Sequence, residues 1–209
     1  MINDILDFSR IERAALELEH IPFNLADLIN SCAQAFQHSA QQRGLALNLP
    51  IPPGLATLRV QGDPTRIRQI LVNLIGNALK FTEHGSVTVE PQWQTLDHEL
   101  VWFTCTVRDS GIGISAERLE LMFDAFQQAD SSRRYGGTGL GLPIARTLAE
   151  RMGGTLRAQS EEGRGSVFTL EIPLAIDQQS SPVIALDAEG KNGAGDGRHV
   201  LLVEDNPVN

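Results

Sequence analysis

The stretch DPTRIRQILVNLIGNALKFT, residues 63–82, constrains the fold more than any other part of the sequence. Asp63-Pro64 is a helix start, because an aspartate can cap the first free amides and proline fits the first helical position. Apolar residues then recur at helical spacing as far as about Phe81, and they form one stripe that must pack against another layer. This stripe consists of Ile67, Ile70, Leu71, Leu74, Ile75 and Ala78.

A second stripe of the same helix is polar. Its members lie within roughly 60° of one another and about 130° from the apolar stripe; they are Arg66, Gln69, Asn73, Asn77 and Lys80. A solvated helix face is one interpretation, but asparagine is a poor helix former and two of them in mid-helix need a reason. Amide oxygens suit Mg²⁺, and a lysine one turn further offers a charge to phosphates that the metal bridges. The stripe therefore predicts a metal–phosphate site at Asn73, Asn77 and Lys80.

Helical and alternating patterns are mixed along the rest of the chain. Helices are expected from Leu25 until Gly44 ends the segment, over 119–126 and over 142–152, the first capped by Asn24. Alternating residues predict strands near 45–49, 86–90, 100–108, 155–160 and 166–173. This mixture favours an α/β layer structure, and 209 residues with 42% apolar composition can bury its core.

Charge and cysteine content exclude some classes of function. The net charge of −9 argues against a broad surface for nucleic acid or anionic membrane, while a local site for a phosphorylated small molecule remains open. Cys32 and Cys105 form no Cys-x-x-Cys pair, so we expect two buried thiols in a reducing compartment. No apolar run reaches the roughly 18 residues that span a bilayer. We expect a chain that is soluble as given and cytoplasmic, with no nucleic-acid or direct membrane contact.

Two glycine-rich motifs invite comparison with known phosphate-binding loops. In residues 136–141, GGTGLG, the P-loop spacing is present, but Leu142 and Pro143 stand where lysine and serine or threonine are required. In residues 109–116, DSGIGISA, a dinucleotide fingerprint is matched, but Asp130, at the distance of the ribose-binding acid, follows a helical pattern instead of a strand. Both assignments are therefore discounted, and a cradle of backbone amides at a helix start remains.

Taken in order, the motifs resemble the catalytic ATP-binding domain of sensor histidine kinases, in the superfamily shared with gyrase, heat-shock chaperone and mismatch-repair ATPases. NLIGNALKFT (73–82) resembles the N box, DSGIGI (109–114) the first glycine box, FDAF (123–126) the F box and GGTGLGL (136–142) the second glycine box. GRGSVF (163–168) is similar to the last conserved turn. The resemblance covers residues 22–174 and implies a two-layer α/β sandwich, with a mixed, mostly antiparallel sheet and helices on one face.

The resemblance implies roles at the phosphate end of a bound ATP. Asn77, helped by Asn73, would hold Mg²⁺, and Lys80 would meet a phosphate. Asn77 and Lys80 are the expected catalytic residues. The second glycine box would cradle phosphates and hinge a lid, and its expected nucleotide-binding residues are Gly137, Thr138, Gly139, Leu140 and Gly141.

At the base end, Asp109 would accept a hydrogen bond from the adenine amine, and Gly111 and Gly113 would let the backbone approach the base. Phe123 and Phe126 would anchor the start of a lid over 124–138. In that lid, Tyr135 is an expected nucleotide contact, and solvated loop residues remain an alternative interpretation of Arg133, Arg134 and Tyr135.

The flanks resemble pieces of neighbouring domains of a hybrid kinase. Residues 1–19 resemble the end of the dimerisation and phosphoacceptor helix, 175–198 have the composition of a flexible linker, and 199–209 resemble the first strand of a receiver domain. In that strand Glu204 and Asp205 would bind Mg²⁺. None of the five histidines begins the His-Glu-x-[Arg/Asn]-x-Pro pattern of the phosphoacceptor, and the receiver's phosphoacceptor aspartate would lie beyond Asn209.

The expected function is the ATP-binding catalytic module of a hybrid sensor histidine kinase, which donates the γ-phosphate to a histidine for onward transfer to a receiver aspartate. The fragment is expected to be a monomer that does not phosphorylate itself; the parent is expected to be a homodimer, with any inner-membrane anchor outside this sequence. The alternative is a degenerate regulatory module that acts by protein–protein interaction without turnover. A gyrase- or chaperone-like ATPase needs a glutamate on the asparagine helix, where Gln69, Asn73 and Asn77 offer only amides.

Overall fold

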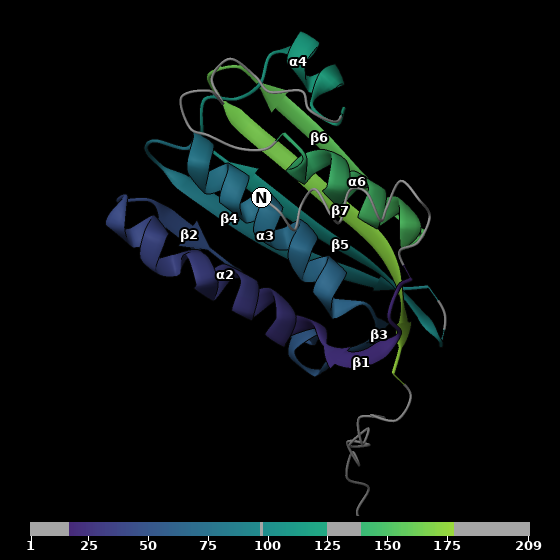
Figure 1. Cartoon of the computed structure of the whole chain (residues 1–209). Helices are drawn as coiled ribbons and strands as arrows, with labels where there is room; N and C mark the ends of the chain where they lie inside the picture. The colour runs from purple at the N-terminus through teal and green to yellow at the C-terminus, as the bar shows by residue number, and fades with distance from the viewer. Residues whose placement is uncertain (1–16, 97, 125–138, 178–209) are drawn as a thin grey trace, which may run out of the picture.

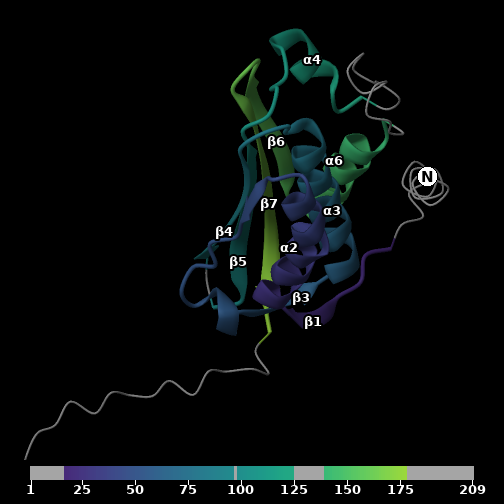
Figure 2. The same ribbon diagram turned by 90° about the vertical axis from the view of Figure 1, so that its left-hand side faces the viewer.

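The computed structural model describes residues 17–96, 98–124 and 139–177. These residues form a sheet and three long helices, namely α2 (Leu25–Gln42), α3 (Pro64–Phe81) and α6 (Gly141–Arg151) (Figure 1). A view turned by 90° places all three helices on the same face of the sheet (Figure 2). The predicted two-layer α/β fold is thereby confirmed.

The sheet has seven strands among the described residues, in the order β1-β3-β7-β5-β4-β2, and β6 pairs with β7 beside this path. The strands are β1 (Ile21–Asn24), β2 (Ala46–Asn48), β3 (Arg59–Gly62), β4 (Ser86–Thr95), β5 (Leu100–Asp109), β6 (Thr155–Glu161) and β7 (Gly165–Ile176). Only the β2–β4 pair is parallel, so the sheet is mixed and mostly antiparallel, as predicted.

The core lies between the inner face of the sheet and the helices. On β5, alternate residues from Val101 to Val107 are buried, and the apolar stripe predicted on α3 is buried along its whole length. Both cysteines are buried free thiols, and burial, with the nearby Cys32 and Glu90, raises the pKa of Cys105 to about 12. Burial likewise raises the pKa of Cys32. Both thiols are therefore buried groups with raised pKa values, which is typical of structural cysteines.

The helix ends follow from local sequence. Asp63 caps α3 by accepting a hydrogen bond from the amide of Arg66 at 2.9 Å, and Asn24 caps α2 by accepting from the amide of Asp27 at 3.0 Å. Gly44 has φ +68°, a backbone conformation that favours glycine and ends α2. These predicted caps and the end of α3 at Phe81 are confirmed.

Four elements differ from the sequence-based prediction. The helix expected over 119–126 is α4 (Ala116–Leu121), because Ser115 occupies its N-cap position and the chain turns after Leu121. Strands β1 and β3 were not predicted: each has four residues, and Pro22 interrupts the donor pattern of β1, which is tolerated because β1 is an edge strand. A short 3₁₀ turn, η1 (Leu55–Thr57), precedes β3.

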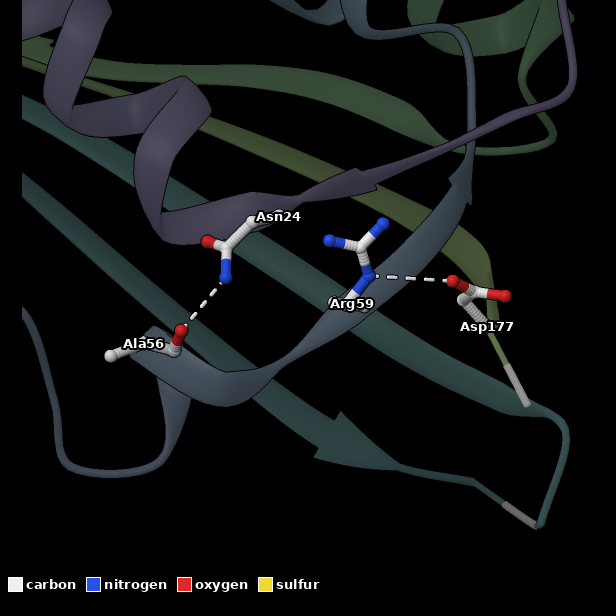
Figure 3. A network of polar contacts seen from close by, with 4 residues as sticks. All are labelled: Asn24, Ala56, Arg59 and Asp177. Atoms are coloured by element: carbon white, nitrogen blue, oxygen red, sulfur yellow. Dashed lines mark hydrogen bonds and ion pairs between the residues drawn. The ribbon is translucent and has the colours of Figure 1, made fainter. Parts of the chain in front are cut away.

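The chain enters and leaves the fold at the same corner, beside β3. β3 pairs with β1 on one side and with the last residues of β7 on the other. Arg59 bonds the buried carboxylate of Asp177 at 3.4 Å, and the Asn24 amide donates to the carbonyl oxygen of Ala56 at 2.7 Å (Figure 3). Most of the predicted dimerisation helix, linker and receiver strand lies outside the described residues, at 1–16 and 178–209. In the described part of the chain, no helix combines the length and apolar character needed to cross a bilayer.

Candidate functional site

The polar stripe of α3 divides into two halves. Near the start of the helix, Arg66 donates to the Gln69 side-chain oxygen at 2.9 Å, so these two side chains are paired with one another. Further along, Asn77 donates its side-chain amide to the Asn73 oxygen at 3.3 Å, and both side chains are half-buried. The predicted site residues therefore lie together on the second half of α3.

The first turn of α6 packs directly on Asn73. A Cβ added to Gly141 would lie 2.2 Å from the Asn73 oxygen, so glycine is required for this close approach. Within the described residues α6 has no side-chain cap: Leu140 is at its N-cap position, and Pro143 in the first turn has no N–H. The N-terminal end of α6 is the positive end of a helix dipole and lies beside Asn73; its role as a phosphate cradle stays a prediction.

One buried donor between α3 and α6 lacks a partner. Among the described residues, the Asn73 Nδ2 atom has no hydrogen-bond partner although it is buried. Such a group destabilises the protein unless something binds there. A phosphate oxygen against the first turn of α6 would satisfy it, so the residues fit a phosphorylated ligand.

The first glycine motif rests on the C-terminal end of α3, next to Lys80, the last member of the polar stripe. Ile112 donates its amide to the carbonyl oxygen of Phe81, the last residue of α3, at 3.2 Å. A Cβ on Gly111 would lie 2.4 Å from that oxygen. Residues 109–114 therefore form a loop, called here the glycine loop, that rests on the C-terminal end of α3.

Asp109 is the charged group at the base of the glycine loop. Its side chain is only 7% exposed, and Oδ1 accepts hydrogen bonds from the amides of Gly111 at 2.8 Å and Ser166 at 3.2 Å. Burial raises the pKa of the Asp109 carboxyl above its ordinary value, and the bonds from Gly111 and Ser166 offset part of this rise. A buried carboxyl held in this way is suited to bind a donor group of a ligand.

A serine pair that was not predicted from the sequence ties the β6–β7 turn to the glycine loop. Ser160 Oγ accepts the amide of Ile114 at 2.8 Å and lies 3.0 Å from Ser166 Oγ. On the same side, a Cβ on Gly113, which has φ +68°, would lie 2.0 Å from the carbonyl oxygen of Glu161. The motif GRGSVF contains Ser166, but no sequence signal marked Ser160.

Lys80 lies near the glycine-loop end of α3. Its ammonium is 4.9 Å from the centre of the Phe81 ring, and burial lowers its pKa below the ordinary value. A half-buried cation here could approach an anionic ligand without first losing a full shell of water.

The protein groups available to a metal are few. The described residues contain no cluster of three His, Cys, Asp or Glu side chains. Asn77 donates through its nitrogen, and its side-chain oxygen has no hydrogen bond within the described residues, so this oxygen is available to a cation. One or two amide oxygens suit Mg²⁺ only when substrate phosphates complete its ligand set. The residues therefore fit Mg²⁺ only together with a phosphorylated ligand, and the Asn77 oxygen is better placed to hold it than the Asn73 oxygen, which already accepts a hydrogen bond.

The predicted lid is described only at its two ends. Phe126, Arg133, Arg134, Tyr135, Gly137 and Thr138 lie outside the described residues. Phe123 packs against the core, and the Arg146 guanidinium of α6 lies 5.0 Å from its ring centre. Gly139 has φ +70°, and the Leu140 side chain is fully buried, so only the Leu140 backbone could contact a ligand.

A separate hollow of about 450 Å³ opens on the outer face of the sheet. It is lined by residues that alternate with the buried ones, including Thr88, Arg108 and Gln159, and it reaches Asp109 and Ser166 from behind. Arg108 forms no ion pair among the described residues, so this hollow is a competing location for a polar ligand.

Comparison with known proteins identifies relatives for most of the chain. The "Signal transduction histidine-protein kinase BarA" of Escherichia coli (strain K12) is 42% identical over 179 residues, 85% of this chain and 19% of the relative. The "Hybrid signal transduction histidine kinase B" of Dictyostelium discoideum is 40% identical over 84% of this chain and 9% of the relative. The chain thus spans a fifth or less of the length of these relatives.

Two solved structures of known proteins share the fold. Full-length ShkA in complex with AMPPNP has a TM-score of 0.68 and 33% identity over 84% of this chain and 35% of that one. The nucleotide-free catalytic domain of the histidine kinase ThkA has a TM-score of 0.58 and 31% identity over 74% of this chain and 95% of that one. The sequence model of the histidine kinase-, DNA gyrase B- and HSP90-like ATPases matches residues 62–176, more than half of the chain. The resemblance inferred from the motifs is therefore confirmed, and this chain belongs to that ATPase family.

Proposed function

We propose that this chain is the ATP-binding catalytic module of a hybrid sensor histidine kinase. It binds Mg²⁺-ATP and donates the γ-phosphate to a histidine of a phosphoacceptor domain, from which the phosphoryl group passes to a receiver aspartate. The observation that carries the proposal is the placement of two glycine motifs along the second half of α3, with Gly141 against Asn73 in mid-helix and Gly111 against Phe81 at the helix end. The names of the kinase relatives support it.

The adenine lies at the glycine loop. Asp109 accepts a hydrogen bond from its exocyclic amine. Gly111 and Gly113 allow the loop to pack closely on the carbonyl oxygens of Phe81 and Glu161, and this packing brings the loop backbone to the base. Oδ1 is already held by two backbone amides, so the carboxyl is oriented before the ligand arrives. The Ser160–Ser166 pair links the glycine loop to the β6–β7 turn and fixes their relative position.

The phosphates lie between the second half of α3 and the first turn of α6. Asn77 offers its oxygen to Mg²⁺ and Asn73 positions Asn77, while Lys80 and the backbone amides from Gly139 to Gly141 face phosphate oxygens. When bound, Mg²⁺ supplies positive charge that neutralises the phosphates. Tyr135, Gly137 and Thr138 are proposed contacts from the lid, and Phe126 its anchor.

The chain's own residues act by positioning. Asn77 and Lys80 hold the γ-phosphate in one orientation for in-line attack, and the amides of α6 stabilise charge on its oxygens. The polar stripe offers no carboxylate to activate water, because positions 69, 73 and 77 carry amides. We therefore expect transfer to a histidine nitrogen and slow hydrolysis.

The proposed domain order is that of a hybrid kinase, with parts of neighbouring domains on both sides of the ATP-binding module. It comprises the end of the phosphoacceptor helix at 1–19, the ATP-binding domain at 22–174, a linker at 175–198 and the start of a receiver at 199–209. The first residues of that linker, 175–177, complete β7 and its corner, so its flexible part would begin after Asp177. The parent is a homodimer that acts in the cytoplasm, either free or anchored in the inner membrane, and the chain alone is a monomer with no nucleic-acid or membrane contact.

Titration calorimetry with a non-hydrolysable ATP analogue tests the proposal. We expect binding heat with Mg²⁺ and much weaker binding without it. No heat under either condition would instead support a degenerate regulatory module. In a parallel incubation with γ-labelled ATP, the chain alone should acquire no stable label, because it contains no phosphoacceptor motif; stable label would contradict the assigned role.

A further inference from the structure

The C-terminal end of α3 is held by an arginine from another helix. Arg43, at the C-cap of α2, donates one guanidinium N–H to the carbonyl oxygen of Leu79 and another to that of Thr82, the latter at 3.0 Å. Helix C-termini expose unpaired carbonyls and carry partial negative charge, so a cation that donates two hydrogen bonds there is favourable.

The backbone that presents Arg43 is itself fixed. The Gly44 amide donates a hydrogen bond to the carbonyl oxygen of Gln41 at 3.0 Å, and the Leu45 amide donates to that of Ala40 at 2.9 Å. This pair of hydrogen bonds is typical of a helix that ends at a glycine. Leu45 is buried in the core directly after this turn. The arginine therefore projects from a rigid position toward α3.

The two carbonyl groups that Arg43 binds lie on either side of the residues of α3 that contact the glycine loop. Lys80 and Phe81 lie between Leu79 and Thr82, and the Phe81 carbonyl oxygen accepts the Ile112 amide of the glycine loop. Within the described residues Arg43 forms no ion pair, so both described bonds of its guanidinium go to this turn. We propose that Arg43 is a positioning residue for ATP binding: by clamping the last turn of α3, it fixes Lys80 and the seat of the glycine loop. This inference rests on the proposed function.

Arg68 provides a matched control. It also joins α2 and α3, donating to Ser31 Oγ at 2.7 Å, but it lies near the start of α3, away from the glycine loop. Arg43→Met and Arg68→Met each remove one guanidinium bridge between the same two helices. A purely structural role of Arg43 would make the two variants behave alike.

Two readouts on folded protein, well below the melting temperature, test the inference. Without nucleotide, hydrogen exchange at the Ile112 amide should accelerate in Arg43→Met and not in Arg68→Met. With the Mg²⁺-ATP analogue, Arg43→Met should bind about tenfold more weakly, because binding must then order the last turn of α3, and Arg68→Met should bind within about twofold of wild type. Affinity unchanged in Arg43→Met, or lowered equally in both, would overturn the inference.

A lysine variant serves if Arg43→Met does not fold. Arg43→Lys keeps the charge but loses the forked geometry, so about threefold weaker binding with faster Ile112 exchange is expected. Wild-type affinity and exchange in Arg43→Lys would then overturn the inference. If the wild-type chain bound no nucleotide, the proposed function would fail, and the exchange readout alone would decide whether Arg43 holds the glycine loop.

Discussion

Polar groups at the two ends of α3 differ in how completely they are paired. At the start of the helix, Asp63 accepts hydrogen bonds from the amides of Arg66 and Glu19, and in the adjacent corner Arg59 is paired with Asp177 (Figure 3). In the second half and at the loop beyond it, a buried amide nitrogen of Asn73 lacks a partner among the described residues, and burial raises the pKa of Asp109.

This difference separates structural from functional polar residues. A buried polar group whose hydrogen bonds are all made within the protein stabilises the fold. A buried polar group that lacks a hydrogen-bond partner destabilises the protein, and such groups are found where a ligand supplies the missing partner. By this criterion the paired groups at the start of α3 and at Arg59–Asp177 hold the fold together, and the second half of α3 is the proposed ligand-binding region. Substitutions in the two regions should therefore move different measured quantities.

The largest contrast should come from two asparagines. Asn77→Ala removes the oxygen offered to Mg²⁺, and we expect ATP-analogue affinity to fall about a hundredfold with little change in stability. Asn24→Ala removes the cap of α2 and the bond to Ala56, so it should lower the free energy of unfolding by about 1 kcal/mol and leave affinity unchanged. Calorimetry and denaturant unfolding on both variants would refute the comparison if Asn24→Ala weakened binding as much as Asn77→Ala.

Asp109→Asn should lower the affinity for the ATP analogue and raise the free energy of unfolding. The amide oxygen can still accept from Gly111 and Ser166, but its NH₂ group faces the adenine amine, so affinity should fall about thirtyfold. Because the folded pKa lies above the unfolded one, the stability contributed by this carboxyl is present below the unfolded pKa and is lost as pH rises through the folded pKa.

The stability gain of Asp109→Asn should therefore be largest at neutral and alkaline pH and disappear in acid, where the wild-type carboxyl is protonated. Melting temperatures measured across that range check the sign. A variant less stable than wild type at pH 8 would show that the carboxylate is a structural group.

Two glycines offer a smaller contrast. Gly141→Ala places a methyl group against the Asn73 oxygen and should weaken ATP-analogue binding about tenfold by displacing it. Gly76→Ala, within α3, meets only the Phe36 ring at 3.6 Å and should stabilise the helix by about 0.5–1 kcal/mol without changing affinity. Equal affinities for the two variants would argue against a phosphate site at Gly141.

The smallest effect should follow from Arg59→Met in the paired corner. Arg59 is 43% exposed, so loss of its ion pair with Asp177 should lower the free energy of unfolding by about 0.5 kcal/mol. Nucleotide affinity should stay at the wild-type value. A clear loss of affinity would mean that this corner is coupled to the site.

The sequence predicts those elements and site residues that are marked by a pattern in neighbouring residues. Asp63-Pro64 and the apolar stripe predict α3 to its last residue, and the family motifs identify Asn77 and Asp109, although their ligands stay predictions. Strands β1 and β3 were missed because four-residue edge segments carry little periodicity.

Residues that act across long sequence separations were also missed. Ser160 meets Ile114 and Arg43 meets Thr82, 46 and 39 positions apart. Their neighbours in the sequence give no sign of these partners, because only the packing of the sheet and helices brings them together. Such supporting residues are found from the structure and then tested by substitution.

Separate titration with the two halves of the ligand tests the central claim most directly. In backbone amide NMR spectra, adenosine should shift Gly111, Gly113 and Ser166, whereas Mg²⁺ with inorganic triphosphate should shift Asn77, Gly139 and Gly141. Shifts of the same residues by both ligands, or shifts confined to Arg108 and Gln159 in the hollow behind the sheet, would contradict a site that extends along α3 between two glycine motifs.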